Sequence, residues 1–243
     1  MQIIKLNATD STNLYLKELM KSQSLEDYTV IAADDQKSGR GQMGTNWESE
    51  PFKNLTFSIL KKMDPFKVTE PFVLNICVSL AIHEVLNKLQ IADLSVKWPN
   101  DILSGNSKIC GILIENMLSG NRILASVIGI GLNVNQVTFD NLPNVSSLKL
   151  LTGKSFNLDN LLKEFQKELK QTFLALHEKG ALEMQRSYEK VLFRKDKPST
   201  FMDTQGNKFM GYVRGVSNDG RLIVSLEDNS RKEFDMKAIS LLY

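Results

Sequence analysis

The chain has 243 residues, which is enough for one full hydrophobic core and one small second unit. Its 42% of hydrophobic and 24% of charged residues are ordinary for a globular protein and argue against disorder and against a membrane span. Thirty basic and 28 acidic residues leave a net charge of +2, which argues against a nucleic-acid-coating surface. The two cysteines have no clustered histidines, which argues against a disulfide framework or a metal cage.

The first half of the chain alternates between strand and helix patterns. Residues 1–7 alternate in polarity like a strand and lack the apolar segment of a secretory signal, so we expect a cytoplasmic protein. Capping residues precede a helix predicted over 12–21, and strands are predicted at 28–34 and 55–60. The apolar run 72–89 contains polar residues that a bilayer would penalise, so it predicts a buried helix.

The middle of the chain continues the same mixture. Strands are predicted at 94–98, 108–116 and 122–134, with a turn between the last two. Apolar residues at helical spacing predict a core-facing helix over 158–176, and a further helix is expected at 181–191. These elements predict an α+β fold in which helices pack behind one central mixed β-sheet.

A charged, proline-containing link at 194–198 ends the helical periodicity. Short strands are then predicted at 211–216, 222–226 and 231–236. We therefore expect two domains, a large one at 1–193 and a small C-terminal β-barrel at 194–243.

A glycine-rich loop at 39–44 follows the second predicted strand. Arg40 lies between two glycines, where its guanidinium can hold a phosphate or a carboxylate, and Trp47 can stack on a purine. The loop lacks both the ending of a P-loop and the spacing of a dinucleotide fold. By itself it would also suit a plain surface turn.

A second polar group follows the strand at 94–98. Lys97, Asn100 and Asp101 supply a cation, an amide and a carboxylate at one mouth of the sheet, although local sequence allows a simple turn equally well. Lys108 opens the next apolar run, so its ammonium can point toward the same mouth, although an isolated lysine there would also suit a solvated strand end.

Small residues end the strand at 122–134. Gly129 and Gly131 fall on one face, where a ligand can approach the backbone, and Asn133 can present an amide oxygen. His83 and His177 lie on predicted helices far from the loops and suit structural roles. No arrangement typical of a covalent acyl-enzyme is present in the sequence, so chemistry here would rest on cations and positioning.

Taken together and in order, these motifs resemble those of the bacterial biotin–protein ligases. The matching segments are 10–13, 36–41, Trp47, 97–101, 108–113 and 129–134. The resemblance implies a catalytic fold like that of the class II aminoacyl-tRNA synthetases with an SH3-like C-terminal barrel. It also implies an ATP-dependent reaction in two steps. Biotin and ATP give biotinyl-5′-AMP and pyrophosphate, and a lysine of a biotin carboxyl carrier domain, as in acetyl-CoA carboxylase, then takes the acyl group.

The resemblance assigns roles residue by residue. The residues implied to contact biotin are Ser11, Thr12, Asn13, Gln36, Arg40, Gly41, Gln42, Lys108, Gly111, Gly129 and Gly131. Those implied to contact ATP are Arg40, Trp47, Lys97, Asn100, Lys108 and Asn133, the last also helping to hold Mg²⁺. Lys108 and Arg40 would be catalytic because their charge lowers the repulsion between carboxylate and phosphate, and Asp101 would position the incoming amine or accept its proton.

Two departures from the family pattern bear on function. Gln42 and Met43 stand where some members carry basic residues, so we expect the adenylate to escape faster than in those members. Nine residues precede Asp10, too few for a DNA-binding winged helix, so we expect no repressor activity. The near-neutral charge agrees with the absence of a nucleic-acid partner, and the composition predicts no membrane partner. A monomer and a homodimer both remain open.

Two other functions compete with biotin ligation. A lipoate or octanoate ligase shares the architecture, but Ser11, Thr12, Asn13 and Gln36 suit a ureido ring better than a dithiolane or alkyl tail. A non-catalytic protein-binding module would need a degenerate pocket, whereas Arg40, Trp47 and Lys108 are all present.

Overall fold

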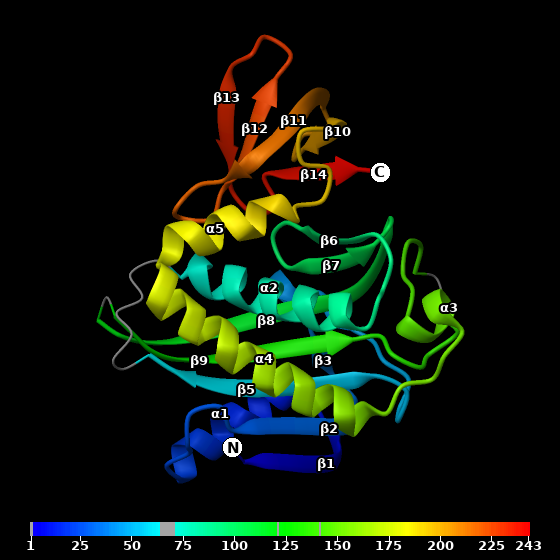
Figure 1. The fold of residues 1–243 in the computed structure, drawn as a ribbon, viewed down its shortest axis with the longest axis vertical. Coiled ribbons are helices and arrows are strands. Elements are labelled where there is room, and N and C mark those ends of the chain that lie inside the picture. The colour runs from blue at the N-terminus through cyan, green and yellow to red at the C-terminus, as the bar shows by residue number, and fades with distance from the viewer. Residues whose placement is uncertain (1, 64–70, 121, 141) are drawn as a thin grey trace.

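The computed structural model describes residues 2–63, 71–120, 122–140 and 142–243, and Figure 1 shows its ribbon. A seven-stranded mixed sheet has the strand order β1-β2-β5-β9-β8-β7-β6. Its strands are β1 (Ile3–Thr9), β2 (Val30–Gln36), β5 (Leu55–Lys62), β6 (Leu94–Lys97), β7 (Asp101–Ser104), β8 (Ser107–Ser119) and β9 (Arg122–Leu132). Strands β1 and β2 run parallel, and the other neighbours are antiparallel.

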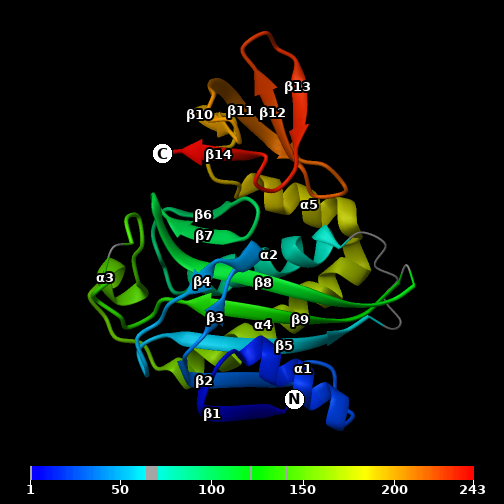
Figure 2. The same cartoon turned by 180° about the vertical axis from the view of Figure 1, so that it is seen from behind.

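Helices cover both faces of this sheet, because its central strands are apolar on both sides. The helices are α1 (Thr12–Ser22), α2 (Phe72–Lys88), α3 (Leu148–Thr152), α4 (Leu158–Lys179) and α5 (Ala181–Lys190). Val30 and Ile59 face the core beneath α2 and α4, whereas Ile31 and Leu60 point the other way and pack with Leu16 of α1. The α+β class is therefore confirmed, but α1 lies on the face opposite α2 and α4 (Figure 2).

The long predicted helix is confirmed as a core element. Leu161, Phe165, Leu169 and Phe173 of α4 are buried, and the ring centroid of Phe165 lies 6.1 Å from that of Phe57 on β5. The apolar run before it forms α2, which is buried along most of its length. In the part of the chain that the structure describes, no helix is both long and apolar enough to cross a bilayer.

The C-terminal part forms a second, antiparallel sheet beyond α5 (Figure 1). Its strands are β10 (Pro198–Asp203), β11 (Lys208–Val216), β12 (Leu222–Leu226), β13 (Arg231–Phe234) and β14 (Ile239–Leu242), in the order β13-β12-β11-β10-β14. Among the described residues β13 and β14 do not pair, so hydrogen bonds do not close the expected barrel. The domain division after residue 193 stays a prediction.

The two sheets share a continuous core. Phe201, Val213 and Leu222 of the second sheet belong to the same buried cluster as α2 and the central strands. Trp98 Nε1 donates a hydrogen bond to the carbonyl of Gly220 at 2.8 Å. Gly220 has a φ of 89°, and a Cβ there would lie 2.3 Å from the Phe72 ring, so glycine is required at this contact. The second sheet is therefore held against the mouth of the first.

Within the two sheets described above, the strands β7, β10 and β14 lie outside the sequence prediction. The segment 98–100 is the turn between β6 and β7, with a cis Trp98-Pro99 bond, and Asp101 begins β7 opposite Lys97. Strands β7 and β14 have four residues each, too few for a periodic pattern to show. The turn interpretation of Asn100 is correct, whereas Asp101 belongs to a strand.

Candidate active site

A cavity of about 640 Å³ opens between the glycine-rich hairpin, the strands β8 and β9, the β6–β7 turn and the second sheet. The hairpin consists of β3 (Gly39–Arg40), a short 3-10 turn (Gln42–Gly44) and β4 (Asn46–Trp47). Fifteen of the sixteen residues expected at the site line this cavity: Ser11, Thr12, Asn13, Gln36, Arg40, Gly41, Gln42, Trp47, Lys97, Asn100, Asp101, Lys108, Gly111, Gly129 and Gly131. Motifs that lie far apart in the sequence therefore meet around one space.

One end of the cavity is polar and almost fully shielded from water. Ser11, at the N-cap of α1, makes no capping hydrogen bond. Thr12 donates through both its backbone N–H and its hydroxyl to Gln36 Oε1, at 3.0 and 3.2 Å. The Ser58 hydroxyl lies 2.7 Å from Thr12 Oγ1 and 2.5 Å from Asn13 Oδ1. This chain of buried, mutually bonded groups can recognise a polar ring of fixed donor and acceptor pattern.

Glycines let the strand backbones come close to the side chains that line the cavity. A Cβ on Gly129 would lie 2.5 Å from Asn13 Oδ1, and one on Gly131 would lie 2.3 Å from Trp47 Cε2. A Cβ on Gly111 would meet the same indole at 2.9 Å. The three glycines are therefore needed for space at the floor of the cavity.

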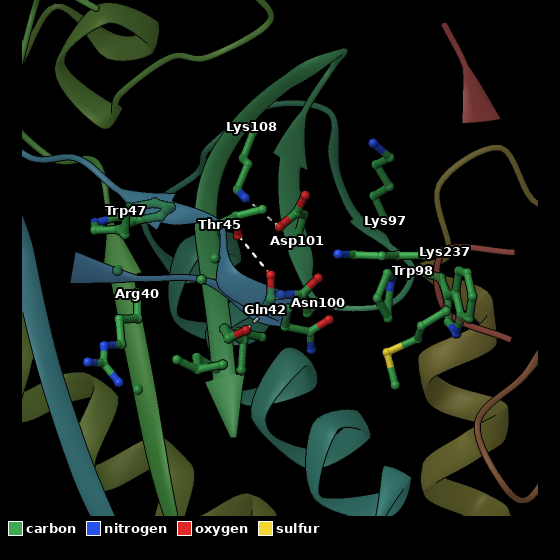
Figure 3. A pocket seen from close by; sticks show the side chains of 18 of the residues that line it. Arg40, Gln42, Thr45, Trp47, Lys97, Trp98, Asn100, Asp101, Lys108 and Lys237 are labelled. Carbon is green, nitrogen blue, oxygen red and sulfur yellow. Dashed lines mark hydrogen bonds and ion pairs between the residues drawn. The ribbon is translucent and has the colours of Figure 1, made fainter. Parts of the chain in front are cut away.

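The other end of the cavity is cationic. Lys108 Nζ lies 2.7 Å from Asp101 Oδ1 and 5.5 Å from the centre of the Trp47 ring. Figure 3 shows Lys108 and Asp101 facing each other across this end, with Lys237 directed toward Asn100 from the side of the second sheet. Among the described residues, those that line the cavity with a charge are four cations, Arg40, Lys97, Lys108 and Lys237, and one carboxylate, Asp101. Such a surplus of positive charge favours a polyanionic ligand.

Neighbouring groups hold this end in place. Asn100 donates from Nδ2 to the carbonyl of Ile112 at 2.7 Å. Lys97 Nζ lies 3.1 Å from the Tyr243 hydroxyl and 4.5 Å from the centre of its ring. Trp47 Nε1 is buried without a hydrogen-bond partner among the residues that the structure describes. A buried donor in this state can bind an acceptor on a ligand.

Asn133 is the expected site residue that the structure does not bring to the cavity. It is buried, and its Nδ2 donates to the carbonyl of Ser146 at 3.0 Å. In the ranges described, no group of histidine, cysteine, aspartate and glutamate side chains could hold a metal ion. Asp101 is the sole described carboxylate lining the cavity and is paired with Lys108. The protein side chains therefore do not fit a Mg²⁺ held by the chain itself.

The cysteines do not add a nucleophile. Both are free and buried. Burial raises the pKa of the Cys77 thiol to about 12. Burial also raises the pKa of the Cys110 thiol, against the opposing effect of Lys108. Thiols with such pKa values stay protonated and unreactive at neutral pH.

Sequence reasoning missed several groups around the cavity. Ser58 is a polar residue inside a buried apolar strand, and this contrast was a usable signal. Glu115 accepts from Asn13 Nδ2 at 2.7 Å, a contact over 102 positions that no local pattern could reveal. The lining from the second sheet, with Lys237, depends on how the two sheets pack and was also out of reach.

The comparisons with known proteins agree with this geometry. The family model described as "Biotin/lipoate A/B protein ligase family" matches residues 6–133. A biotin protein ligase from Aquifex aeolicus, solved with biotin and ATP, superposes with a TM-score of 0.82 at 27% identity over 99% of this chain and 98% of that one.

Curated relatives match the part of the chain that carries the motifs. The "Bifunctional ligase/repressor BirA" of Bacillus spizizenii is 32% identical over 139 residues, 57% of this chain and 42% of that protein. A "Biotin--[acetyl-CoA-carboxylase] ligase" of Paracoccus denitrificans is 31% identical over 131 residues, 53% of each chain. The matched region thus spans about half the length of these relatives or less. The match of the family model over more than half of the chain shows that the protein belongs to the biotin/lipoate A/B protein ligase family.

Proposed function

We propose that this protein is an ATP-dependent biotin–protein ligase, which forms biotinyl-5′-AMP and transfers the biotinyl group to a lysine of a biotin carboxyl carrier domain. One observation carries the proposal: a single cavity has a buried hydrogen-bonding end and a cationic end, with the Trp47 indole between them. Biotin and ATP are together a polar ring, an alkyl chain, a carboxylate and a triphosphate. The hydrogen-bonding end of the cavity suits the polar ring of biotin, and the cationic end suits the carboxylate and the triphosphate.

The polar end would bind the ureido ring. Asn13, Thr12 and Gln36 are hydrogen-bonded to each other or to Ser58, so their remaining donors and acceptors are fixed in direction. A ureido group offers one carbonyl acceptor and two N–H donors, which such a network can match. Groups that a wrong ligand leaves unpaired here are costly because they are buried.

In the first step the biotin carboxylate oxygen forms a bond to the α-phosphorus of ATP, and the bond from that phosphorus to the bridging oxygen breaks, releasing pyrophosphate. The reacting groups are both anionic, so their approach is opposed by charge. Lys108 and Arg40 supply the positive charge that lowers this repulsion as the transition state forms. Lys237 and Lys97 extend the cationic surface toward the leaving pyrophosphate.

In the second step the carrier lysine, as a neutral amine, forms an amide bond to the biotinyl carbonyl carbon, and the bond to the AMP oxygen breaks. The amine loses one proton in this step. Asp101, whose side chain is 20% exposed, is the lining carboxylate that can orient the amine or accept this proton. Its ion pair with Lys108 links the two steps, because movement of Lys108 toward phosphate frees Asp101 for the amine.

The nucleotide would bind with its base on Trp47, whose buried Nε1 has no described partner. Magnesium would enter with the phosphates, because the described lining of the cavity offers one carboxylate, Asp101, which is paired with Lys108, and the Asn133 side chain bonds to Ser146 instead. When bound it would screen phosphate charge.

The proposal is tested by biotin-dependent exchange of labelled pyrophosphate into ATP, which reports adenylation without any carrier. We expect exchange with biotin and none with lipoate or octanoate. Exchange with lipoate instead would identify the other branch of the family. No exchange with any of these acids would contradict a catalytic role.

A further inference from the structure

Asn13 uses both of its amide hydrogens inside the protein. Its Nδ2 donates to Glu115 Oε2 at 2.7 Å and to the carbonyl of Leu113 at 3.4 Å, and the residue is buried. Its Oδ1 faces Ser58 and the backbone of Gly129. Because the donors are occupied, what Asn13 offers the cavity is an acceptor.

Glu115 is held in turn from behind. Lys17 Nζ lies 2.6 Å from Glu115 Oε1, and the two side chains are 29% and 34% exposed. A continuous chain of contacts therefore runs from Lys17 through Glu115, Asn13 and Ser58 to Thr12. Glu115 does not line the cavity, so it acts on a ligand through Asn13.

Asn13 and Ser58 alone do not determine which of them donates the hydrogen bond between their side chains. The Ser58 hydroxyl has one hydrogen and two neighbours, Thr12 Oγ1 and Asn13 Oδ1. If the Asn13 amide were turned so that Oδ1 and Nδ2 changed places, the Ser58 hydroxyl could accept from Asn13 Nδ2 and donate to Thr12 Oγ1. In both arrangements the Ser58 hydroxyl keeps a hydrogen-bond partner, so Ser58 does not decide between them. An ionised carboxylate can only accept hydrogen bonds, so Glu115 permits only the arrangement in which Asn13 Nδ2, rather than Oδ1, faces it.

We infer that Glu115, braced by Lys17, is a positioning residue that fixes the amide of Asn13 so that the site accepts hydrogen bonds from a ligand ring bearing N–H donors. The inference rests on the proposed function, and it extends that function to the recognition of a cyclic urea. A ring without N–H donors, such as a dithiolane, would leave Asn13 Oδ1 with the Ser58 hydroxyl alone and its second lone pair without a donor.

Substituting Glu115→Gln keeps the shape of the side chain and adds a donor. The introduced glutamine has one oxygen, for which the Lys17 ammonium and Asn13 Nδ2 compete. When Lys17 takes this oxygen, the new amide nitrogen faces Asn13 Nδ2, so two donors oppose each other. We expect the KM for biotin to rise at least tenfold, while the KM for ATP and kcat stay within about threefold. Glu18→Gln is the matched control, since Glu18 makes an exposed ion pair with Lys21 on the same helix, and it should change nothing.

The double variant Lys17→Met/Glu115→Gln separates orientation from mere packing. Without Lys17, the amide oxygen of the introduced glutamine is free to face Asn13, so most of the lost affinity for biotin should return. Lys17→Met alone should raise the KM for biotin no more than about threefold. An unchanged KM in Glu115→Gln, or a double variant as weak as the single one, would overturn the inference.

Calorimetric titration of biotin into each variant measures the same affinities without catalysis. It keeps this test separate from that of the proposed function, because pyrophosphate exchange by the wild type decides the latter. Thermal unfolding of the variants checks that each is folded. Equal biotin affinity of the wild type and Glu115→Gln by titration would overturn the inference even if both were active.

Discussion

Replacing Lys108 by methionine removes one ammonium from the cationic end of the cavity and keeps a side chain of similar length. A unit charge at about 4 Å from a phosphate oxygen contributes about 4 kcal/mol at an effective dielectric of about 20. The Lys108 side chain is 32% exposed, so solvent screens part of this interaction. About 3 kcal/mol remains, which corresponds to adenylation slower by about 100-fold.

The assay is single-turnover formation of biotinyl-5′-AMP with saturating biotin and ATP. Lys88→Met is the matched control, because Lys88 pairs with Glu168 on the helical surface and should leave the rate unchanged. The loss in Lys108→Met should appear in the rate constant while the thermal unfolding midpoint stays close to that of the wild type. A rate within threefold of the wild type would refute the assignment of Lys108 as the principal cation.

Three further predictions concern packing and titration. Gly131→Ala should displace the Trp47 indole, shift tryptophan emission to the red and lower the adenylation rate at least tenfold, because the new Cβ would lie 2.3 Å from a ring atom; unchanged emission would contradict the close packing. Cys77 and Cys110 should resist a thiol reagent at pH 8 in the native state and react fully in denaturant, since burial raises the pKa of both; rapid native labelling would count against this. Burial holds the pKa of His83 below its ordinary 6.5, so the unfolded chain takes up a proton first as the pH falls. The contribution of His83 to the free energy of unfolding should therefore be at its maximum above pH 6.5 and decline below it by at most about 1.4 kcal/mol per pH unit. His83→Gln should flatten this dependence in urea titrations.

Local pattern was a good guide wherever one element carried its own signal. The apolar stripe of α4 was readable because burial of one helix face imposes a period of 3.6 on a sequence. The strands around Val30 and Ile59 were readable as short apolar runs, because strands that are buried on both faces are apolar throughout. The side on which α1 packs was not readable, because the central strands are apolar on both faces. Short strands such as β7 fell below the length at which a period appears.

For the site as well, residues within sequence motifs were predicted, whereas residues that depend on contacts between distant segments were missed. Residues carried by dense motifs, such as Arg40 and Lys108, were found because several such motifs occur together and in the order that the family shows, although each motif alone would suit a surface turn or a solvated strand end. Glu115 and Lys237 were missed because their importance arises from contacts between distant segments. Asn133 ends its strand next to glycines that do line the cavity, yet its side chain turns to Ser146, a direction that spacing does not determine.

The most direct test of the central claim is the intact mass of a purified apo biotin-carrier domain after incubation with this protein, MgATP and either biotin or lipoate. The proposed function predicts the gain of one biotinyl group on one lysine, dependent on ATP and absent with lipoate. A gain of a lipoyl group, or no gain with biotin on a carrier that a known biotin ligase modifies, would contradict it.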